Sequence, residues 1–141
     1  MIHFKLASVT GVKFDDDVYE IVVPTKDGAI AIYQDHMPLV SAGAPGVISV
    51  RKRPEDRGDD VEHFAVSGGV VQIDGKTVNF LSDEVTASDE VTEAEAEAAV
   101  KRAEELLAKA PDQQALNEAK RVLARNNARL QVVRLKKRHH R

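Results

Sequence analysis

The stretch from Ser88 to Lys137 reads SDEVTEAEAEAAVKRAEELLAKAPDQQALNEAKRVLARNNARLQVVRLKK. Its apolar side chains recur every three or four positions, at Ala96, Ala99, Val100, Ala103, Leu106, Leu107 and Ala110 and then at Leu116, Ala119, Leu123, Leu130 and Val133. This spacing predicts two amphipathic helices. Pro111 cannot continue a helix and Asp112 is a good N-terminal cap, so the break between them predicts an antiparallel two-helix hairpin.

The face that the first of these helices offers to the rest of the protein is mostly alanine. Burying one methyl group contributes about 0.8 kcal/mol at best, and a leucine contributes several times more. The sequence therefore predicts a hairpin that packs closely but weakly. A marginally docked helical pair can leave one surface and occupy another. A permanent helical cap on the core is the alternative that the periodicity leaves open.

Charge separates the two predicted helices. Residues 88–111 hold seven acids and three bases, a net charge of −4, and residues 112–141 hold nine bases and two acids, a net charge of +7. A basic terminal helix on an otherwise acidic chain indicates an acidic protein surface, an anionic membrane or a nucleic acid as partner. The aromatic side chains on which single-stranded nucleic acids stack are missing from this helix. We therefore favour a protein partner and expect no nucleic acid.

The composition limits the class of protein. With 141 residues and no cysteine, the chain has no disulfide framework and no thiolate metal site. The opening residues MIHFKL hold neither a long apolar run nor a cleavage site, so we expect no signal peptide. No window approaches the roughly 20 apolar residues that span a bilayer. We expect any association with a membrane to go through a partner.

Residues 1–87 differ from the helical part in being rich in Val, Ile and Thr, with frequent turn residues, which predicts a β-sandwich. Ile2, Phe4 and Leu6 alternate with polar residues, as in a half-buried strand. Asp15, Asp16 and Asp17 are predicted to lie in a surface turn, and Val18–Val23 to form a strand that Pro24 ends. Gly68 and Gly69 indicate a bulge or a close backbone approach. Asp74-Gly75 between two apolar runs predicts a type I′ hairpin.

The composition changes from β-branched residues to Ala and Glu near 87–90. Thr92 with Glu95 forms a capping-box pattern, which places the start of the first helix at Thr92. The predicted fold class is therefore β + α. An N-terminal β-sandwich domain (residues 1–87) is followed by a C-terminal antiparallel two-helix hairpin, the regulatory domain (residues 88–141).

No arrangement of residues indicates catalysis. Ser67 before Gly68-Gly69 lacks the glycine two positions earlier that a nucleophile elbow requires. The five histidines do not share the i, i+4 spacing of a helical metal site, and the glycines fit neither the dinucleotide-binding nor the P-loop pattern. We expect no catalytic residues, no metal and no cofactor.

Four segments resemble those of a known family. Residues 27–40, DGAIAIYQDHMPLV, resemble the Gly-x-x-Gly-Ile-x-x-Gly-His-x-Pro-Leu stretch of the ε subunit of bacterial F-type ATP synthases. Residues 42–48, AGAPGVI, are similar to the strand start that follows it, and residues 67–73, SGGVVQI, to the family's Gly-Gly strand. Residues 78–83, VNFLSD, resemble the last strand before the helices. The order of sandwich and then helical hairpin agrees with the family as well.

The resemblance implies a non-catalytic rotor subunit of the central stalk in a proton-translocating enzyme. Its sandwich would couple the γ subunit to the c-ring, and its helices would restrain ATP hydrolysis by the α/β catalytic head. It would lie at the cytoplasmic face of the inner (plasma) membrane as a peripheral part of the complex, touching the membrane only through the c-ring.

The resemblance also assigns two groups of residues. The loop that faces the c-ring or γ would comprise Tyr33, Gln34, Asp35, His36, Met37 and Pro38. The residues that meet an acidic loop of the catalytic head when the hairpin opens would be Arg125, Arg129, Arg134, Lys136 and Lys137. For His36, a histidine that merely hydrogen-bonds its own turn is an equally good interpretation.

The chain departs from the family pattern at several positions. Ala31 and Asp35 stand where the family has glycine, and Ala29 where an acidic residue is common, so Asp35 could take over the contact to the c-ring. Some members bind ATP through an (Ile/Leu)-Asp-x-x-Arg-Ala motif. Here Thr92 replaces the aspartate and Glu95 replaces the arginine. A carboxylate repels a triphosphate, so we predict no ATP binding.

A free-standing regulatory module is the alternative to the ε subunit. In that hypothesis the basic C-terminal helix would bind anionic lipid or RNA, and a liposome or filter-binding assay on the isolated protein separates the two.

Overall fold

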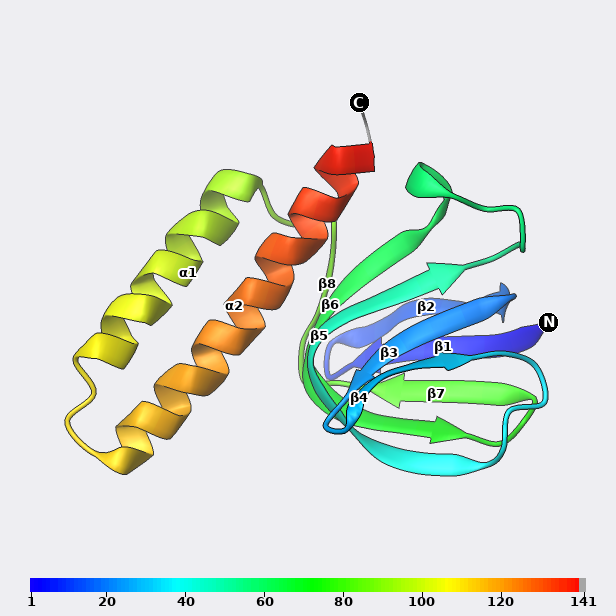
Figure 1. The fold of residues 1–141 in the computed structure, drawn as a ribbon, viewed down its shortest axis with the longest axis horizontal. Helices are drawn as coiled ribbons and strands as arrows, with labels where there is room; N and C mark the ends of the chain where they lie inside the picture. The colour runs from blue at the N-terminus through cyan, green and yellow to red at the C-terminus, as the bar shows by residue number, and fades with distance from the viewer. Residues whose placement is uncertain (140–141) are drawn as a thin grey trace.

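The computed structural model describes residues 1–139, with side-chain surroundings through Lys136. The strands and helices, in chain order, are β1 (Ile2–Ser8), β2 (Gly11–Val18), β3 (Glu20–Thr25), β4 (Gly28–Ile32), β5 (Leu39–Arg51), a short 3-10 helix (Gly58–Asp60), β6 (Glu62–Ile73), β7 (Thr77–Leu81), β8 (Val85–Ala87), α1 (Glu93–Ala108) and α2 (Gln113–His139). Figure 1 shows the strands gathered on one side and the two helices side by side on the other. The predicted β + α fold class is confirmed.

The strands form one sheet that folds over into two layers. Their order is β2-β1-β7-β6-β5-β3-β4, with β8 paired to β6. The long strands β5 and β6 curve from one layer into the other and close the sandwich (Figure 1). The core between the layers contains large side chains that are fully or almost fully buried, among them Ile2, Phe4, Leu6, Ile21, Ile32, Ile48, Ile73 and Phe80. No helix residue whose burial the structure describes belongs to this core cluster, so the sandwich has a core of its own.

Pro24 was predicted to end a strand, and that prediction is wrong, because Pro24 lies inside β3. The segment Val18–Val23, which was predicted as one strand, is divided between two. Val18 ends β2, β3 begins at Glu20, and Tyr19 lies between them. The register of β3 with β5 shifts between Val22 and Thr25. A proline has no N–H to donate, and at such an irregularity the sheet tolerates it.

The three consecutive aspartates were predicted in a turn, and that prediction is wrong. Asp15, Asp16 and Asp17 lie on β2, an edge strand of the sheet, and all three are exposed. His3 on the neighbouring β1 lies between two of them, with Nε2 2.5 Å from Asp15 Oδ1 and Nδ1 2.7 Å from Asp17 Oδ1. An edge strand can carry several charges because one of its sides meets solvent, and such charges protect the edge.

The hairpin between β6 and β7 is centred one residue later than predicted. Asp74 N–H donates to the Thr77 carbonyl (3.1 Å), so Gly75 and Lys76 occupy the turn. Gly75 has a φ of +95°, but Lys76 does not have a positive φ, because Asp35 is the one non-glycine residue with positive φ in the described chain. Type I′ requires positive φ at both central residues, so the predicted turn type is wrong. Asp74 instead accepts the N–H groups of Lys76 (3.2 Å) and Thr77 (2.8 Å) with its side chain.

The predicted close approach at the glycine pair is confirmed. Gly69 has a φ of +135°, and a Cβ atom there would lie 2.0 Å from the Leu81 carbonyl oxygen. No side chain fits in that space, and the backbone conformation itself favours glycine. The chain after β7 can therefore lie directly against β6.

Both helices begin as the sequence predicted. Thr92 caps α1 by accepting the Glu95 N–H at 3.1 Å, and its hydroxyl donates to the Glu95 carboxylate at 3.0 Å. Asp112 accepts the Ala115 N–H at 2.8 Å in the same way at the start of α2. α1 and α2 run antiparallel (Figure 1), which confirms the hairpin. One further strand, β8, precedes the helices and was not predicted.

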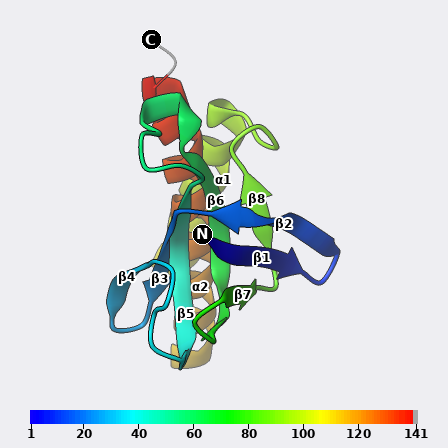
Figure 2. The ribbon, with the colours of Figure 1, turned by 90° about the vertical axis from the view of Figure 1, so that its right-hand side faces the viewer.

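The helix that docks on the sandwich is α2, not α1. α2 lies on β5 and β6, and α1 packs mainly on α2, so that α1 is the outer layer (Figures 1 and 2). The buried side chains of the docking seam are Ala65 of β6 with Ala128 and Val132 of α2. The seam of small side chains that was predicted for α1 thus lies on α2, and its weakness remains a prediction.

The alanine stripe of α1 meets α2 instead. Ala96 and Val100 are buried against Leu130, as the periodicity indicated. Leu106 departs from the predicted stripe, because 58% of its surface is exposed.

Candidate functional site

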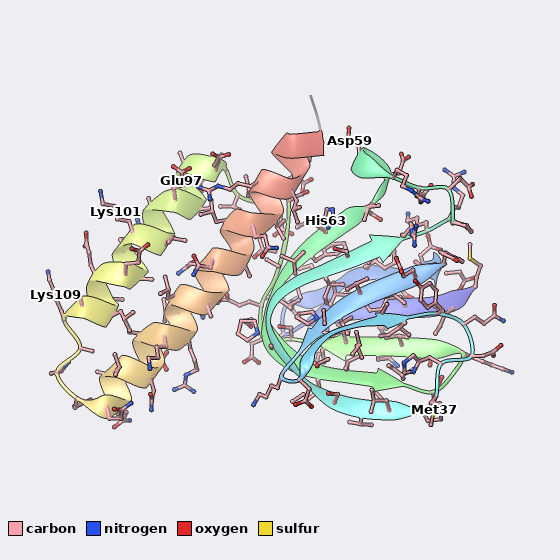
Figure 3. The ribbon with its side chains drawn as sticks, viewed as in Figure 1. Met37, Asp59, His63, Glu97, Lys101 and Lys109 are labelled. Carbon is pink, nitrogen blue, oxygen red and sulfur yellow. The ribbon has the colours of Figure 1, made fainter. Side chains whose placement is uncertain are left out.

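The loop of residues 33–38 connects β4 to β5 at an end of the sandwich away from the helices, where Figure 3 labels Met37. Tyr33 is tied back to the sheet, because its hydroxyl donates to Glu20, which also accepts from Arg51 at 3.0 Å. The hydrogen bond to Glu20 raises the pKa of Tyr33 above its ordinary value. The Tyr33 ring also contacts Tyr19 edge-on, with 5.6 Å between centroids.

The remainder of the loop is held by hydrogen bonds of its backbone, one of them to the turn between β6 and β7. Asp35 has a φ of +65° and donates its N–H to the Gly75 carbonyl at 3.0 Å. This left-handed conformation explains why the resembling family has glycine here, and aspartate is among the residues that tolerate it. His36 Nδ1 lies 2.7 Å from the Met37 carbonyl oxygen, so the histidine hydrogen-bonds within the turn. Met37 is 79% exposed and is the large apolar group that the loop presents.

An exposed apolar row crosses the outer face of the sandwich. The strand registers align Val12 of β2 with Ala7 of β1, Ala7 with Leu81 of β7, Leu81 with Val70 of β6, and Val70 with Ala42 of β5. Leu81 is 59% exposed and Val70 49% exposed. This row was not predicted from the sequence. The signal in the sequence was pairs of consecutive apolar residues within single strands. Neighbouring side chains of a strand point to opposite faces, so one member of each pair must point out of the core.

The basic residues of α2 do not form one free surface. Arg129 Nη2 lies 2.6 Å and Arg125 Nε 3.3 Å from the same Glu84 carboxylate oxygen. Arg134 pairs with Glu97 of α1 at 3.2 Å. Lys136 lines a cavity at the C-terminal end of α2, beside Asp59 and His63, which Figure 3 labels. The side chain of Lys137 lies outside the described part of the chain.

A groove of about 530 Å³ runs between the two helices. Its floor includes Ala99 and Ala103, and four cations line it: Arg102, Lys109, Arg125 and Arg129. Thr92 and Glu95, the positions where the ATP motif is changed, do not line this groove but form the cap of α1. Two of its four cations are already paired with Glu84.

The described residues contain no group of three or more His, Asp or Glu side chains placed to hold a metal ion. Within residues 1–139, neither helix is long and apolar enough to cross a membrane.

Comparison with known proteins identifies the family. Residues 1–88 match the family model described as ATP synthase, Delta/Epsilon chain, beta-sandwich domain. An ATP synthase epsilon chain of Neisseria meningitidis serogroup B is 40% identical over 113 residues, which are 80% of this chain and 79% of that protein. The ATP synthase epsilon chain of Chloroflexus aggregans is 39% identical over 98 residues, 70% of this chain and 67% of that one.

Two solved assemblies contain chains of the same fold. A chain of the Euglena gracilis mitochondrial ATP synthase, in a structure of OSCP, F1 and c-ring, superimposes with a TM-score of 0.76 at 18% identity, covering 90% of this chain and 78% of that one. A chain from the central stalk and c-ring of the Tetrahymena thermophila mitochondrial ATP synthase gives 0.59 at 17% identity, covering 97% and 94%. With the fold, the motifs and the identity over most of its length in agreement, this chain belongs to the family of ATP synthase epsilon chains.

Proposed function

We propose that this chain is a non-catalytic subunit of the central stalk, which couples the γ subunit to the c-ring and restrains ATP hydrolysis through its C-terminal helices. The sequence relatives are epsilon chains, and the structural neighbours come from assemblies that contain a c-ring. The subunit would be peripheral and would reach the membrane only through the c-ring. Catalysis would remain with the α/β head.

The sandwich offers two surfaces for the stalk. The loop 33–38 has a backbone fixed by hydrogen bonds and an exposed Met37, which suits a contact that must survive rotation. The apolar row of Val12, Leu81 and Val70 is the larger surface, and exposed apolar patches of this kind mark protein interfaces. We assign the row to γ and the loop to the c-ring or the adjoining base of γ.

The observation that carries the inhibitory part is the thin docking seam under α2. Ala65, Ala128 and Val132 are its buried members. Burial of such small side chains contributes roughly 3–5 kcal/mol, before the cost of ordering the helices is subtracted. A contact of this strength permits a docked and an undocked hairpin of similar free energy.

The hairpin in its undocked form would present Arg125, Arg129, Arg134, Lys136 and Lys137 to an acidic surface of the catalytic head. In the docked form, Arg125 and Arg129 are paired with Glu84 of the sandwich, whereas Arg134 is paired with Glu97 inside the hairpin. Docking and inhibition would therefore exclude each other, which gives a two-state regulator. The alternative, a free-standing module that binds lipid or RNA with this helix, has no supporting observation in the docked form, because those arginines are occupied.

The test is to truncate the chain after Ala87. Among the residues whose burial is described, the sandwich core contains none from the helices, so residues 1–87 should fold and assemble with the other subunits. ATP hydrolysis by the enzyme reassembled with residues 1–87 should exceed hydrolysis with the full chain. Equal rates, with equal incorporation of both forms, would show that the helices do not restrain hydrolysis.

A further inference from the structure

Glu84 links the sandwich to the helices by charge. It lies between β7 and β8, and its Oε2 is 2.6 Å from Arg129 Nη2 and 3.3 Å from Arg125 Nε on α2. Arg129 is also oriented by Asn126, with 3.4 Å between Nη1 and Oδ1. One carboxylate thus hydrogen-bonds Arg129 and forms a longer ion pair, without a hydrogen bond, to Arg125 Nε. The proposed function assigns both arginines to the catalytic head.

The backbone of Glu84 is held by hydrogen bonds that do not involve the arginines. Its N–H donates to Ser67 Oγ at 3.2 Å, and its carbonyl accepts from the Ser67 N–H at 3.3 Å and from the Ser82 hydroxyl at 3.0 Å. Ser82 itself is 2% exposed. The contact of Gly69 with Leu81 brings this segment against β6. The Ser67-Gly68-Gly69 segment, which resembles no catalytic turn, therefore serves to position Glu84.

We infer that Glu84 is an internal acidic competitor, which holds Arg125 and Arg129 in the docked hairpin and so opposes their binding to an acidic partner. The effect on inhibition rests on the proposed function, whereas the contact between Glu84 and the arginines does not. A partner that binds the undocked hairpin must overcome every interaction that favours the docked one. The strength of inhibition in this chain would then be set partly by a residue of the sandwich.

The docking arm of the test uses the isolated full chain. Because the chain has no cysteine, a label pair can be introduced at Lys26→Cys and Gln114→Cys, on exposed positions of the sandwich and of α2, and the distance distribution measured. Glu84→Gln should raise the undocked population roughly five-fold, the effect of losing one or two partly exposed ion pairs. High salt screens the ion pairs of the wild type, so at high salt the undocked populations of wild type and Glu84→Gln should be equal.

The matched control is Asp83→Asn, which makes the same charge change one residue earlier. Asp83 is exposed and has no ion pair within the described residues, so its variant should behave as wild type. Arg129→Gln removes the shorter of the two contacts to Glu84 from the helix side, so it should shift the distances in the same direction as Glu84→Gln. The double variant should add little to Glu84→Gln, because the carboxylate that Arg129 binds is already absent from that variant. Unchanged distances in both single variants, or an equal shift in Asp83→Asn, would overturn the inference.

The second arm measures ATP hydrolysis by the reassembled enzyme with the Glu84→Gln chain. The inference predicts slower hydrolysis than with wild type, because the arginines are released to the catalytic head, and no change with Asp83→Asn. The distance measurement tests the docking contact, and the hydrolysis measurement tests the inhibitory function, so failure of one can be told from failure of the other. A shift in distances with unchanged hydrolysis would leave the competitor contact in place and contradict the inhibitory function.

Discussion

Val132 of α2 is fully buried and packs in one small cluster with Ala65 of β6. This pair joins the two parts of the molecule, since α1 packs mainly on α2. The Val132→Ala variant should destabilise docking by about 1–2 kcal/mol, because it removes buried methyl groups. Hydrogen exchange should then accelerate in α2 and stay unchanged in β6 and β7. Val40→Ala, at a position that is 67% exposed, is the control, and faster exchange throughout the sandwich would contradict a local seam.

The apolar row should be needed for assembly but not for folding. Leu81→Lys places a charge in the middle of the row, and we expect loss of co-purification with the γ subunit, while the unfolding transition shifts little because Leu81 is 59% exposed. Asn79→Lys puts the same charge two residues earlier on the same face of β7 and should assemble normally. Normal assembly of both variants would show that the row is not part of the interface with the γ subunit.

ATP should not bind to the isolated chain at physiological concentration. Glu95 carries a negative charge where the ATP motif has arginine, and a carboxylate repels a triphosphate. Isothermal titration should give no binding heat with wild type. The double variant Thr92→Asp, Glu95→Arg restores the motif at both positions and is the informative comparison. Sub-millimolar affinity of the wild-type hairpin would refute the prediction.

His3 should make the stability of the sandwich depend on pH. Hydrogen bonds to Asp17 and then Asp15 raise the pKa of His3 above its ordinary 6.5. A raised pKa in the folded state means that the contribution is fully present below pH 6.5 and is lost as pH rises through the folded pKa. His3→Gln should therefore be less stable than wild type in acid and equal to it in alkali. An NMR titration of the ring that gives an ordinary pKa would exclude this linkage.

The sequence predicted the architecture well where a local rule governs the chain. Thr92 and Asp112 cap their helices by contacts within one turn, and Gly69 lies where only glycine fits. The failures are positions where a neighbour far along the chain decides. Pro24 remains in a strand because β3 shifts its register against β5 there, and the Asp15–Asp17 run is compatible with a strand because β2 is an edge.

The candidate sites divide in the same way. A one-dimensional pattern can show that α2 is basic, but not that Glu84, 45 residues before Arg129, neutralises part of it. It can show two amphipathic helices, but not which of them lies on the sandwich. The apolar row depends on the registers of five strands, and no single strand displays it. Tyr33 was predicted as a contact residue, and its bond to Glu20 is likewise a tertiary contact.

The most direct test of the two-state account locks the hairpin on the sandwich inside the assembled enzyme. Ala65 and Ala128 are buried in the same cluster, and the chain has no other cysteine to interfere with an Ala65→Cys, Ala128→Cys pair. Formation of the disulfide is followed on a non-reducing gel, and ATP hydrolysis is measured before and after reduction. The account predicts faster hydrolysis in the oxidised enzyme and a return to the restrained rate on reduction. An identical rate in both states would contradict it.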